Sequence, residues 1–300
     1  MTVQEFYSDL KSSRIKKVIM DTDTFNEIDD QYAVAYALCH PDRIQVLSYN
    51  AAPYFNDNST GPADGMEKSY KEIKKVLNLM KASVPVYRGS DRFISEDPAH
   101  RPVDSPASRN IIHTVLSSPD PIYILAIGAI TNVVSAIMLE PAIINNMAVI
   151  WLGGHQLDHE DVREFNLMQD YYAGQYLINC KVPLLLAPAF YVTAELVIHY
   201  PDVQQLKGHN PICDYLFQIT DQIYRLQGKE ENWYRVIWDI AAVAPLALPD
   251  SVELQEIPAP LFTDSYQYSF DENRHPILYM NKLHRDLIIQ DCWEKLCKRV

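Results

Sequence analysis

Short apolar runs alternate with segments of helical character along most of the chain. Each run is continuously apolar, which is typical of strands that are buried on both faces of a sheet. The five predicted strands cover residues 16–20, 44–49, 121–127, 147–152 and 182–187. Five helices are predicted over residues 28–39, 63–80, 105–117, 131–139 and 170–179. This alternation predicts an α/β fold, in which helices flank a mostly parallel, open sheet.

No composition shift or linker divides the chain. We therefore expect residues 1–300 to form a single domain, with residues 1–15 as an N-terminal extension. Residues 88–109 are polar and rich in proline, which predicts a long surface loop. Residues 211–238 predict a helix, a charged turn "QGKEEN" at 227–232, and a segment "WYRVIWD" after it.

Composition and charge exclude several classes of function. A hydrophobic share of 48% is enough for a sizeable core. The net charge of −13 argues against a nucleic-acid binder, which would carry a basic surface. No apolar run approaches the roughly 20 residues that span a bilayer, so we expect no membrane contact. Five scattered cysteines without a CxxC pair, and an N-terminus without a signal-peptide core, predict a cytoplasmic protein with reduced thiols.

Polar or glycine-containing loops follow four of the predicted strands. In chain order these loops read "DTDTFNEIDD", "NAAPYFNDNS", "GAITN" and "GGHQLDHEDVREFN". Ligands of open parallel sheets bind beyond the carboxyl ends of the strands. The sequence therefore predicts a functional site where these loops meet.

The first loop is unusually acidic, with Asp21, Asp23, Glu27, Asp29 and Asp30 inside eleven residues. A carboxylate at the start of a helix can cap it, and this would explain Asp29 or Asp30 but not the acids before them. Several carboxylates in one buried pocket repel each other unless a cation or a proton offsets their charge. Oxygen ligands without His or Cys select a hard ion, calcium or magnesium. We therefore predict a metal site.

The acidic loop can be compared with two other metal-binding sequence motifs. An EF-hand requires acids at alternate positions and a central glycine, which the loop lacks. The sequence "DTDTF" partly matches the DxDx[TV] pattern of magnesium-dependent aspartyl phosphatases, but Phe25 stands at the fifth position. From these residues alone the phosphatase stays an alternative.

Four motifs in order give a more specific signal. "VIMDTDTFNEIDDQYA" is similar to an apolar strand followed by DxDPGxDDxxA, with two extra residues before the paired acids and no PG. "LAIGAITNVVSAIMLEP" is similar to LGPLTN…LEP, and "WLGGHQLDHEDVREFNLMQDYYAG" to MGG…GN…EFN…DPEAA. "WDIAAVAPLALPD" is similar to HDPLAVAYLIDP. Over nearly its whole length the chain therefore resembles the inosine–uridine-preferring nucleoside hydrolases.

The resemblance implies the nucleoside hydrolase fold and hydrolysis of an N-glycosidic bond to free base and ribose. It implies one calcium ion, held by Asp23, Asp30, Asp239 and the backbone carbonyl of Ile127, and it makes Asp23 the base that activates water. It also implies a homo-oligomer, a dimer or tetramer. An acidic pocket suits this reaction, because a positive charge develops on the sugar in the transition state.

Substrate contacts are also implied by the resemblance. The implied contacts with a nucleoside or ribose-like substrate are Asp29, Asn56, Asp158, Glu164, Asn166, Trp238 and Asp239. At Asp158 the family usually has Asn.

Trp238 stands where the family often has a His that protonates the leaving base. Tryptophan cannot act as an acid at neutral pH, and a purine-preferring branch of the family also has Trp-Asp there. We therefore expect a preference for purine ribonucleosides, with a core position for Trp238 as the alternative. His155 and His159 are expected to be solvated, with an acid role for either as the second possibility. A non-catalytic ribose or nucleoside binder is the remaining alternative for the whole chain.

Overall fold

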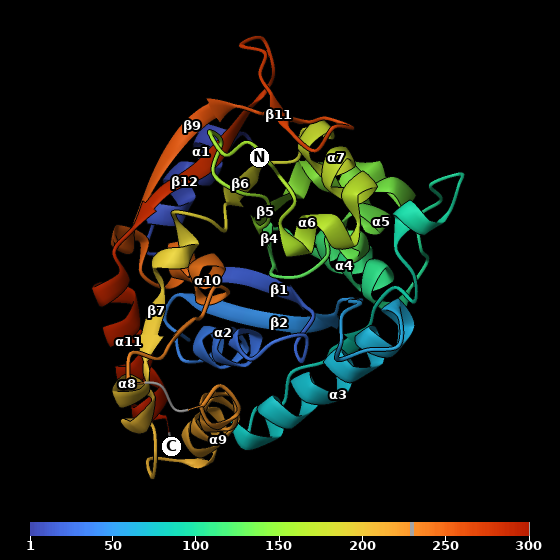
Figure 1. Cartoon of the computed structure of the whole chain (residues 1–300). Helices are drawn as coiled ribbons and strands as arrows, with labels where there is room; N and C mark the ends of the chain where they lie inside the picture. The colour runs from blue at the N-terminus through green and yellow to red at the C-terminus, as the bar shows by residue number, and fades with distance from the viewer. Residues whose placement is uncertain (229–230, 300) are drawn as a thin grey trace.

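The computed structural model describes residues 1–228 and 231–299. Eight strands form one sheet in the order β3-β2-β1-β4-β5-β6-β12-β9. All neighbours in it run parallel except the edge pair β12 and β9 (Figure 1). The strands are β1 (Lys16–Thr22), β2 (Ile44–Ala51), β3 (Val86–Arg88), β4 (Ile122–Ala126), β5 (Met147–Leu152), β6 (Leu184–Ala187), β9 (Val252–Pro258) and β12 (Pro276–Leu283). The predicted α/β fold with a mostly parallel open sheet is confirmed.

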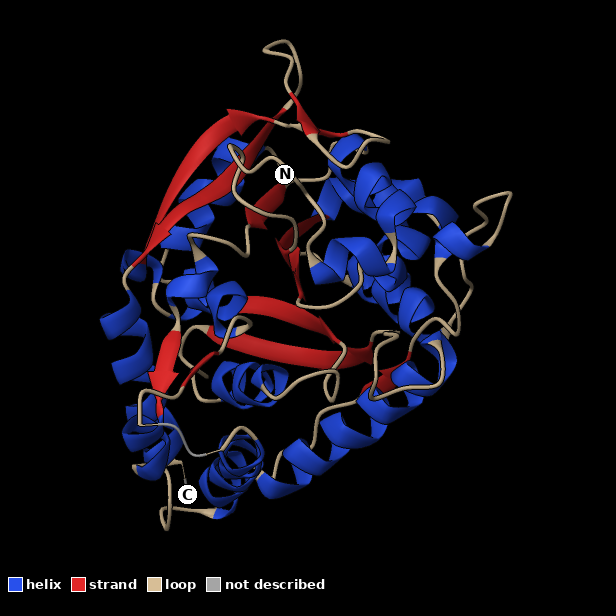
Figure 2. Ribbon diagram, viewed as in Figure 1, coloured by secondary structure: helices blue, strands red, loops and turns tan. Residues whose placement is uncertain are grey.

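Helices cover both faces of this sheet (Figure 2). They are α1 (Val3–Lys11), α2 (Asp29–Leu38), α3 (Pro62–Leu79), α4 (Pro106–Ser117), α5 (Thr131–Leu139), α6 (Phe165–Gln169), α7 (Tyr171–Asn179), α8 (Tyr200–Gln204), α9 (Pro211–Leu226), α10 (Ile240–Ala247) and α11 (Arg285–Lys298). Short 3-10 helices cover Ile94–Glu96, Pro141–Asn146, Thr193–Glu195 and Pro249–Ser251. Two small ribbons pair β7 (Val197–His199) with β8 (Tyr234–Val236), and β10 (Leu261–Phe262) with β11 (Tyr268–Ser269).

The central strands are buried on both faces, as their continuous apolar runs predicted. In β4, Tyr123 and Leu125 join one buried cluster, and Ile122 and Ile124 join another. The first cluster packs against α1, α2, α3, α9, α10 and α11, and the second against α4, α5 and α7. The sheet therefore separates two apolar layers, and its strands lie between them.

All five predicted strands and all five predicted helices form, with ends that shift by a few residues. Three strands of the sheet, β3, β9 and β12, were not predicted. The sequence "VELQEIP" of the edge strand β9 mixes polar and apolar residues on a partly solvated edge. Residues 88–109 hold the last residue of β3, one 3-10 helix and the first turn of α4 besides the expected loop. The expected helix of 211–238 is α9, and "WYRVIWD" contributes β8; residues 229–230 of the expected turn lie outside the described residues.

Residues 1–15 carry α1, which packs against the main core. Thr2 caps this helix, and Phe6 and Leu10 on its inner side are buried. The Phe6 ring lies 5.8 Å from the ring of Tyr123 in β4. The division into one domain and an N-terminal extension stays a prediction. Within residues 1–228 and 231–299, no helix combines the length and the apolar character needed to cross a membrane.

Candidate active site

The acidic loop after β1 leads directly into α2. Asp29 and Asp30 occupy the first turn of α2, and Ile28 is the residue at the N-cap. Both acids therefore lie at the start of a helix, as predicted, although neither is the N-cap residue. Both side chains are buried, with 4% and 1% of their residue surface exposed.

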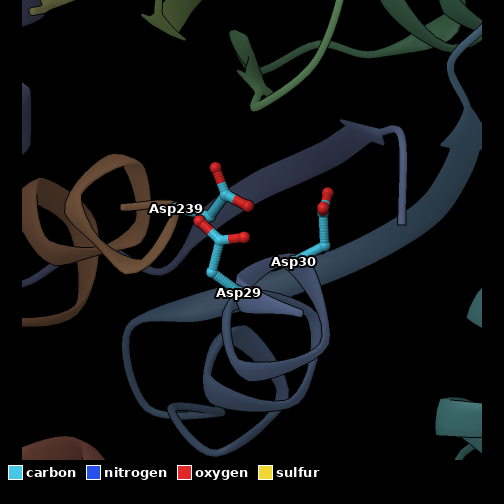
Figure 3. Close-up of side chains that lie close together, drawn as sticks. All are labelled: Asp29, Asp30 and Asp239. Atoms are coloured by element: carbon cyan, nitrogen blue, oxygen red, sulfur yellow. The ribbon is translucent and has the colours of Figure 1, made fainter. Parts of the chain in front are cut away.

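Asp239 meets these two acids from a distant part of the sequence. It immediately precedes α10, and it is also buried. One carboxylate oxygen from each of Asp29, Asp30 and Asp239 lies within 4.8 Å of the others. Figure 3 shows Asp29 and Asp30 rising from the first turn of α2, with the carboxylate of Asp239 beside that of Asp29. The sequence placed Asp30 and Asp239 in the metal site but assigned Asp29 to the sugar.

Asp23 lies next to this cluster, at the end of β1. Its Oδ1 and the Oδ2 of Asp30 are buried and have no hydrogen-bond partner among the described residues. The other oxygen of Asp30 accepts a hydrogen bond from Thr22 Oγ1. Unsatisfied buried carboxylate oxygens are costly, and a hard cation is the group that would satisfy them. The donor set therefore fits a divalent ion.

The electrostatics of the cluster point the same way. Burial raises the pKa of Asp23, Asp30 and Asp239 well above the ordinary range, and the charges of neighbouring acids raise each further. Burial also raises the pKa of Asp29 to about 7, although the nearby Arg235 lowers it. Without a cation these groups would hold protons near neutrality, so the buried Asp29/Asp30/Asp239 cluster is a candidate metal site.

The inserted residues of the acidic loop hold Asp23 in place. Asn26 Nδ2 donates to Asp23 Oδ2 at 2.6 Å, and the Asn26 N–H donates to the Asp23 carbonyl at 2.9 Å. Gly128 packs against the other side, where an added Cβ would lie 2.8 Å from Asp23 Cγ. Asn26 therefore supplies a buried amide that orients one carboxylate, a role that was not predicted from the sequence.

We expect Asn26→Ala to lower kcat for the N-glycosidic hydrolysis that the family resemblance implies, roughly tenfold to a hundredfold. The reason is that a hydrogen bond to a charged group contributes about 1.5–3 kcal/mol. Asn58→Ala is the matched control. Asn58 Nδ2 donates to the Asn26 carbonyl at 2.8 Å but does not reach Asp23. Steady-state kinetics on both variants check this, and equal activities would contradict an orienting role for Asn26.

A cavity opens at this edge of the sheet. It holds about 650 Å³ of unfilled space, which includes open solvent at its mouth. Its polar lining is Asn26, Glu27, Asp29, His155, Glu164, Asn166 and Asp239, and its apolar lining is Ile127, Leu152, Phe165, Ala189, Phe190 and Trp238. Buried acids and aromatic rings therefore face one space.

Most of the residues predicted to contact substrate line this cavity, but two do not. Asp158 is exposed and lines a separate surface hollow with His159 and Tyr191. Asn56 is half-buried outside the lining, where its Nδ2 donates to the Asn26 carbonyl at 3.2 Å. In this structure, neither faces the site directly.

Glu164 and Asn166 line the cavity, and their side chains also form hydrogen bonds with backbone groups. Glu164 caps α6 and accepts N–H bonds from Gly154, Asn166 and Leu167 at 2.8–3.0 Å. Burial raises its pKa to about 7, against the lowering effect of these bonds. Asn166 Nδ2 donates to the Leu152 carbonyl at 3.0 Å, which fixes the amide at the end of β5.

Sequence reasoning missed three features of the site. His155 was expected to be solvated, and this is wrong, because only 7% of its surface is exposed and it lines the cavity. Phe190, in the loop after β6, was not considered, although it also follows a strand of the sheet. Tyr54 is buried, and its hydroxyl has no hydrogen-bond partner in the described part of the chain; burial, followed by the charge of Asp23, raises the pKa of that hydroxyl.

Solved structures define the class of this fold as nucleoside hydrolase. The plant nucleoside hydrolase PpNRh1 matches with a TM-score of 0.78 at 17% identity, over 95% of this chain and 100% of its own. The purine-preferring ribonucleoside hydrolase from Gardnerella vaginalis matches with a TM-score of 0.76 at 16% identity, over 94% of this chain and 98% of its own.

Sequence comparison gives the family. The family model described as inosine-uridine preferring nucleoside hydrolase matches residues 18–267, and the chain belongs to this family. It is therefore an enzyme that hydrolyses the N-glycosyl bond of ribonucleosides. The pyrimidine-specific ribonucleoside hydrolase RihA of Salmonella arizonae is 24% identical over 72% of this chain and 73% of its own length. Family membership removes the phosphatase and the non-catalytic binder as alternatives.

Proposed function

We propose that this enzyme is a calcium-dependent nucleoside hydrolase that prefers purine ribonucleosides and releases free base and ribose. The observation that carries the proposal is one cavity lined by both Asp239 and Trp238, neighbours in sequence. Asp239 belongs to the buried carboxylate cluster, which suits the sugar and an ion. Trp238 offers an aromatic surface of the kind on which a purine stacks.

The proposed ion is held by Asp23, Asp30 and Asp239, with the carbonyl of Ile127. The two unpartnered oxygens of Asp23 and Asp30 support this set, and the all-oxygen chemistry supports calcium. When bound, such an ion offsets the charge of the carboxylates and polarises water and the ribose hydroxyls. Asp29, the third acid of the Asp29/Asp30/Asp239 cluster, is the proposed contact of the ribose diol.

In the proposed reaction, the bond between C1′ and the base nitrogen breaks and a bond from C1′ to a water oxygen forms. Asp23 takes the proton of that water, because its carboxylate is held by Asn26 at the cavity edge. Asp29, Glu164, Asn166 and Asp239 hold the sugar, and the negative charge of the three carboxylates stabilises the cation that develops on it. The departing base takes a proton from solvent, and Asp23 returns its proton to solvent after the products leave.

A pyrimidine preference is the second candidate, favoured by the name of the RihA relative. The structural relative from Gardnerella vaginalis is named for purines, and the aromatic lining supports that preference here. We expect Trp238→Ala to impair purine substrates more than pyrimidine ones if the base stacks on the indole.

The test is a calcium-supplemented reducing-sugar assay over purine and pyrimidine ribonucleosides, with Asp30→Asn as the inactive control. We expect ribose release from purine ribonucleosides first, and a loss of activity when calcium is chelated. Equal rates with and without divalent ions, or faster release from every pyrimidine substrate, would contradict the corresponding part of the proposal.

Two further expectations accompany this function. The resemblance suggests a dimer or tetramer, which light scattering on the purified protein would measure. The five cysteines are free in the structure, which supports a cytoplasmic location.

A further inference from the structure

Three aromatic rings form a continuous wall along the cavity. The ring of His155 lies 4.6 Å from that of Phe190, tilted by 40°. Phe190 in turn meets Trp238 edge-on at 6.4 Å. All three line the cavity that also holds Asp29 and Asp239, so a ligand whose sugar reaches the acids places its other end against this wall.

The backbone around His155 is fixed at several points. The N–H of Gly154 donates to Glu164 at 3.0 Å, and the Gly154 carbonyl accepts from Ala189 at 2.9 Å. The φ of Gly154 is +72°, a conformation that favours glycine, and it makes the turn that brings the next residue to the cavity. The carbonyl of His155 accepts from the Tyr268 hydroxyl at 2.6 Å. The position of the imidazole is therefore built into the fold.

The imidazole has hydrogen-bonding capacity that the protein does not use. Nδ1 of His155 is buried and has no partner within residues 1–228 and 231–299. Each amide in the lining already uses one N–H within the protein, since Asn26 donates to Asp23 and Asn166 donates to the Leu152 carbonyl. A buried ring nitrogen without a partner is unfavourable, so a ligand that supplies one gains binding free energy.

We propose that His155 is the hydrogen-bond partner of the leaving nucleobase, which packs against Phe190 and Trp238; this rests on the proposed function. The free Nδ1 of a neutral imidazole donates or accepts according to the tautomer, so it can meet either kind of group on the edge of a nucleobase, whereas ionised carboxylates can only accept. Burial, and next the neighbouring His159, lower the pKa of His155 to about 4. The ring is therefore neutral near pH 7. It recognises the base by a hydrogen bond and does not act as a general acid.

The test compares His155→Phe with His159→Phe. His159 is the matched control because it stacks on the same Phe190 ring, 5.7 Å away, yet its Nδ1 lies 2.7 Å from the Asp161 carbonyl and it lines the separate surface hollow. Each variant is assayed on several ribonucleosides and on 4-nitrophenyl riboside. Nitrophenolate leaves readily and presents no base edge, so its release reports on the sugar and water steps alone.

For His155→Phe we expect kcat/KM on ribonucleosides to fall roughly tenfold, with 4-nitrophenyl riboside nearly unchanged and the ranking of bases altered. His155→Asn, which keeps a donor and an acceptor, should recover part of the lost kcat/KM on ribonucleosides. If the Phe variant does not fold, the same comparison of ribonucleosides with 4-nitrophenyl riboside is made on His155→Asn. His159→Phe should match the wild type on all substrates.

Three outcomes would overturn the inference. These are an unchanged His155→Phe enzyme, an equal loss on the nitrophenyl substrate, and an equal effect in the His159→Phe control. Failure of the proposed function is distinguishable, because the wild-type enzyme would then release no ribose from any nucleoside.

Discussion

Asp23→Asn is expected to lower kcat for ribonucleoside hydrolysis by roughly 10²- to 10⁴-fold, the usual contribution of a positioned general base, with KM little changed. The substitution preserves the shape of the side chain. An amide oxygen can still accept the hydrogen bond from Asn26 Nδ2, so the loop keeps its conformation. What disappears is the carboxylate that receives the proton of the attacking water.

Loss of the ion would mimic this result, because Asp23 is also a proposed ligand. Titration with calcium separates the two roles. If only affinity for the ion had fallen, saturating calcium would restore kcat, whereas loss of the base leaves kcat low at every concentration. Wild-type kcat in Asp23→Asn at saturating calcium would remove Asp23 from the proton transfer.

The fold was predictable because its main signals are local. Continuous apolar runs such as 121–127 reflect strands buried on both faces, and the helices between them begin and end near their predicted residues. Strand β9 lacked such a signal because it lies at an edge with solvent on one side, where polar residues are tolerated.

The site was less predictable, because its residues converge from distant segments. Asp30 and Asp239 are 209 positions apart, and only the family resemblance related them. Asp158 was placed in the site by analogy, but the loop after Gly154 turns its side chain to the surface. His155 was misjudged because nothing local distinguishes a loop histidine in solvent from one buried under Phe190.

Without divalent ions, the free energy of unfolding of the enzyme is expected to fall as the pH rises from about 4 to about 7. In the folded state, burial raises the pKa of Asp29 and Glu164 to about 7 and shifts Asp30 and Asp239 in the same direction. The folded state therefore binds more protons than the unfolded state over this interval. Stability is highest while these acids are protonated and falls as they must ionise inside the protein.

Calcium should reverse this trend, because it binds the ionised carboxylates of the folded state. At a free concentration 100-fold above Kd, a ligand adds about 2.7 kcal/mol to the free energy of unfolding. Since protons compete with the ion for the same oxygens, the increase in Tm should be larger near pH 8 than near pH 5. Thermal unfolding in chelator and in calcium, at both pH values, measures the difference.

The variant Asp30→Asn distinguishes stabilisation by an ion bound at the carboxylate cluster from a general effect of salt on stability. The variant removes one buried charge, while the amide oxygen can still accept from Thr22. Near pH 8 without calcium it should therefore unfold at a higher temperature than the wild type, because fewer like charges repel one another. With calcium the order should reverse, since only the wild type keeps the full set of ligands. A calcium shift of equal size in both proteins would mean that the ion binds elsewhere, and the buried carboxylates would then need another explanation.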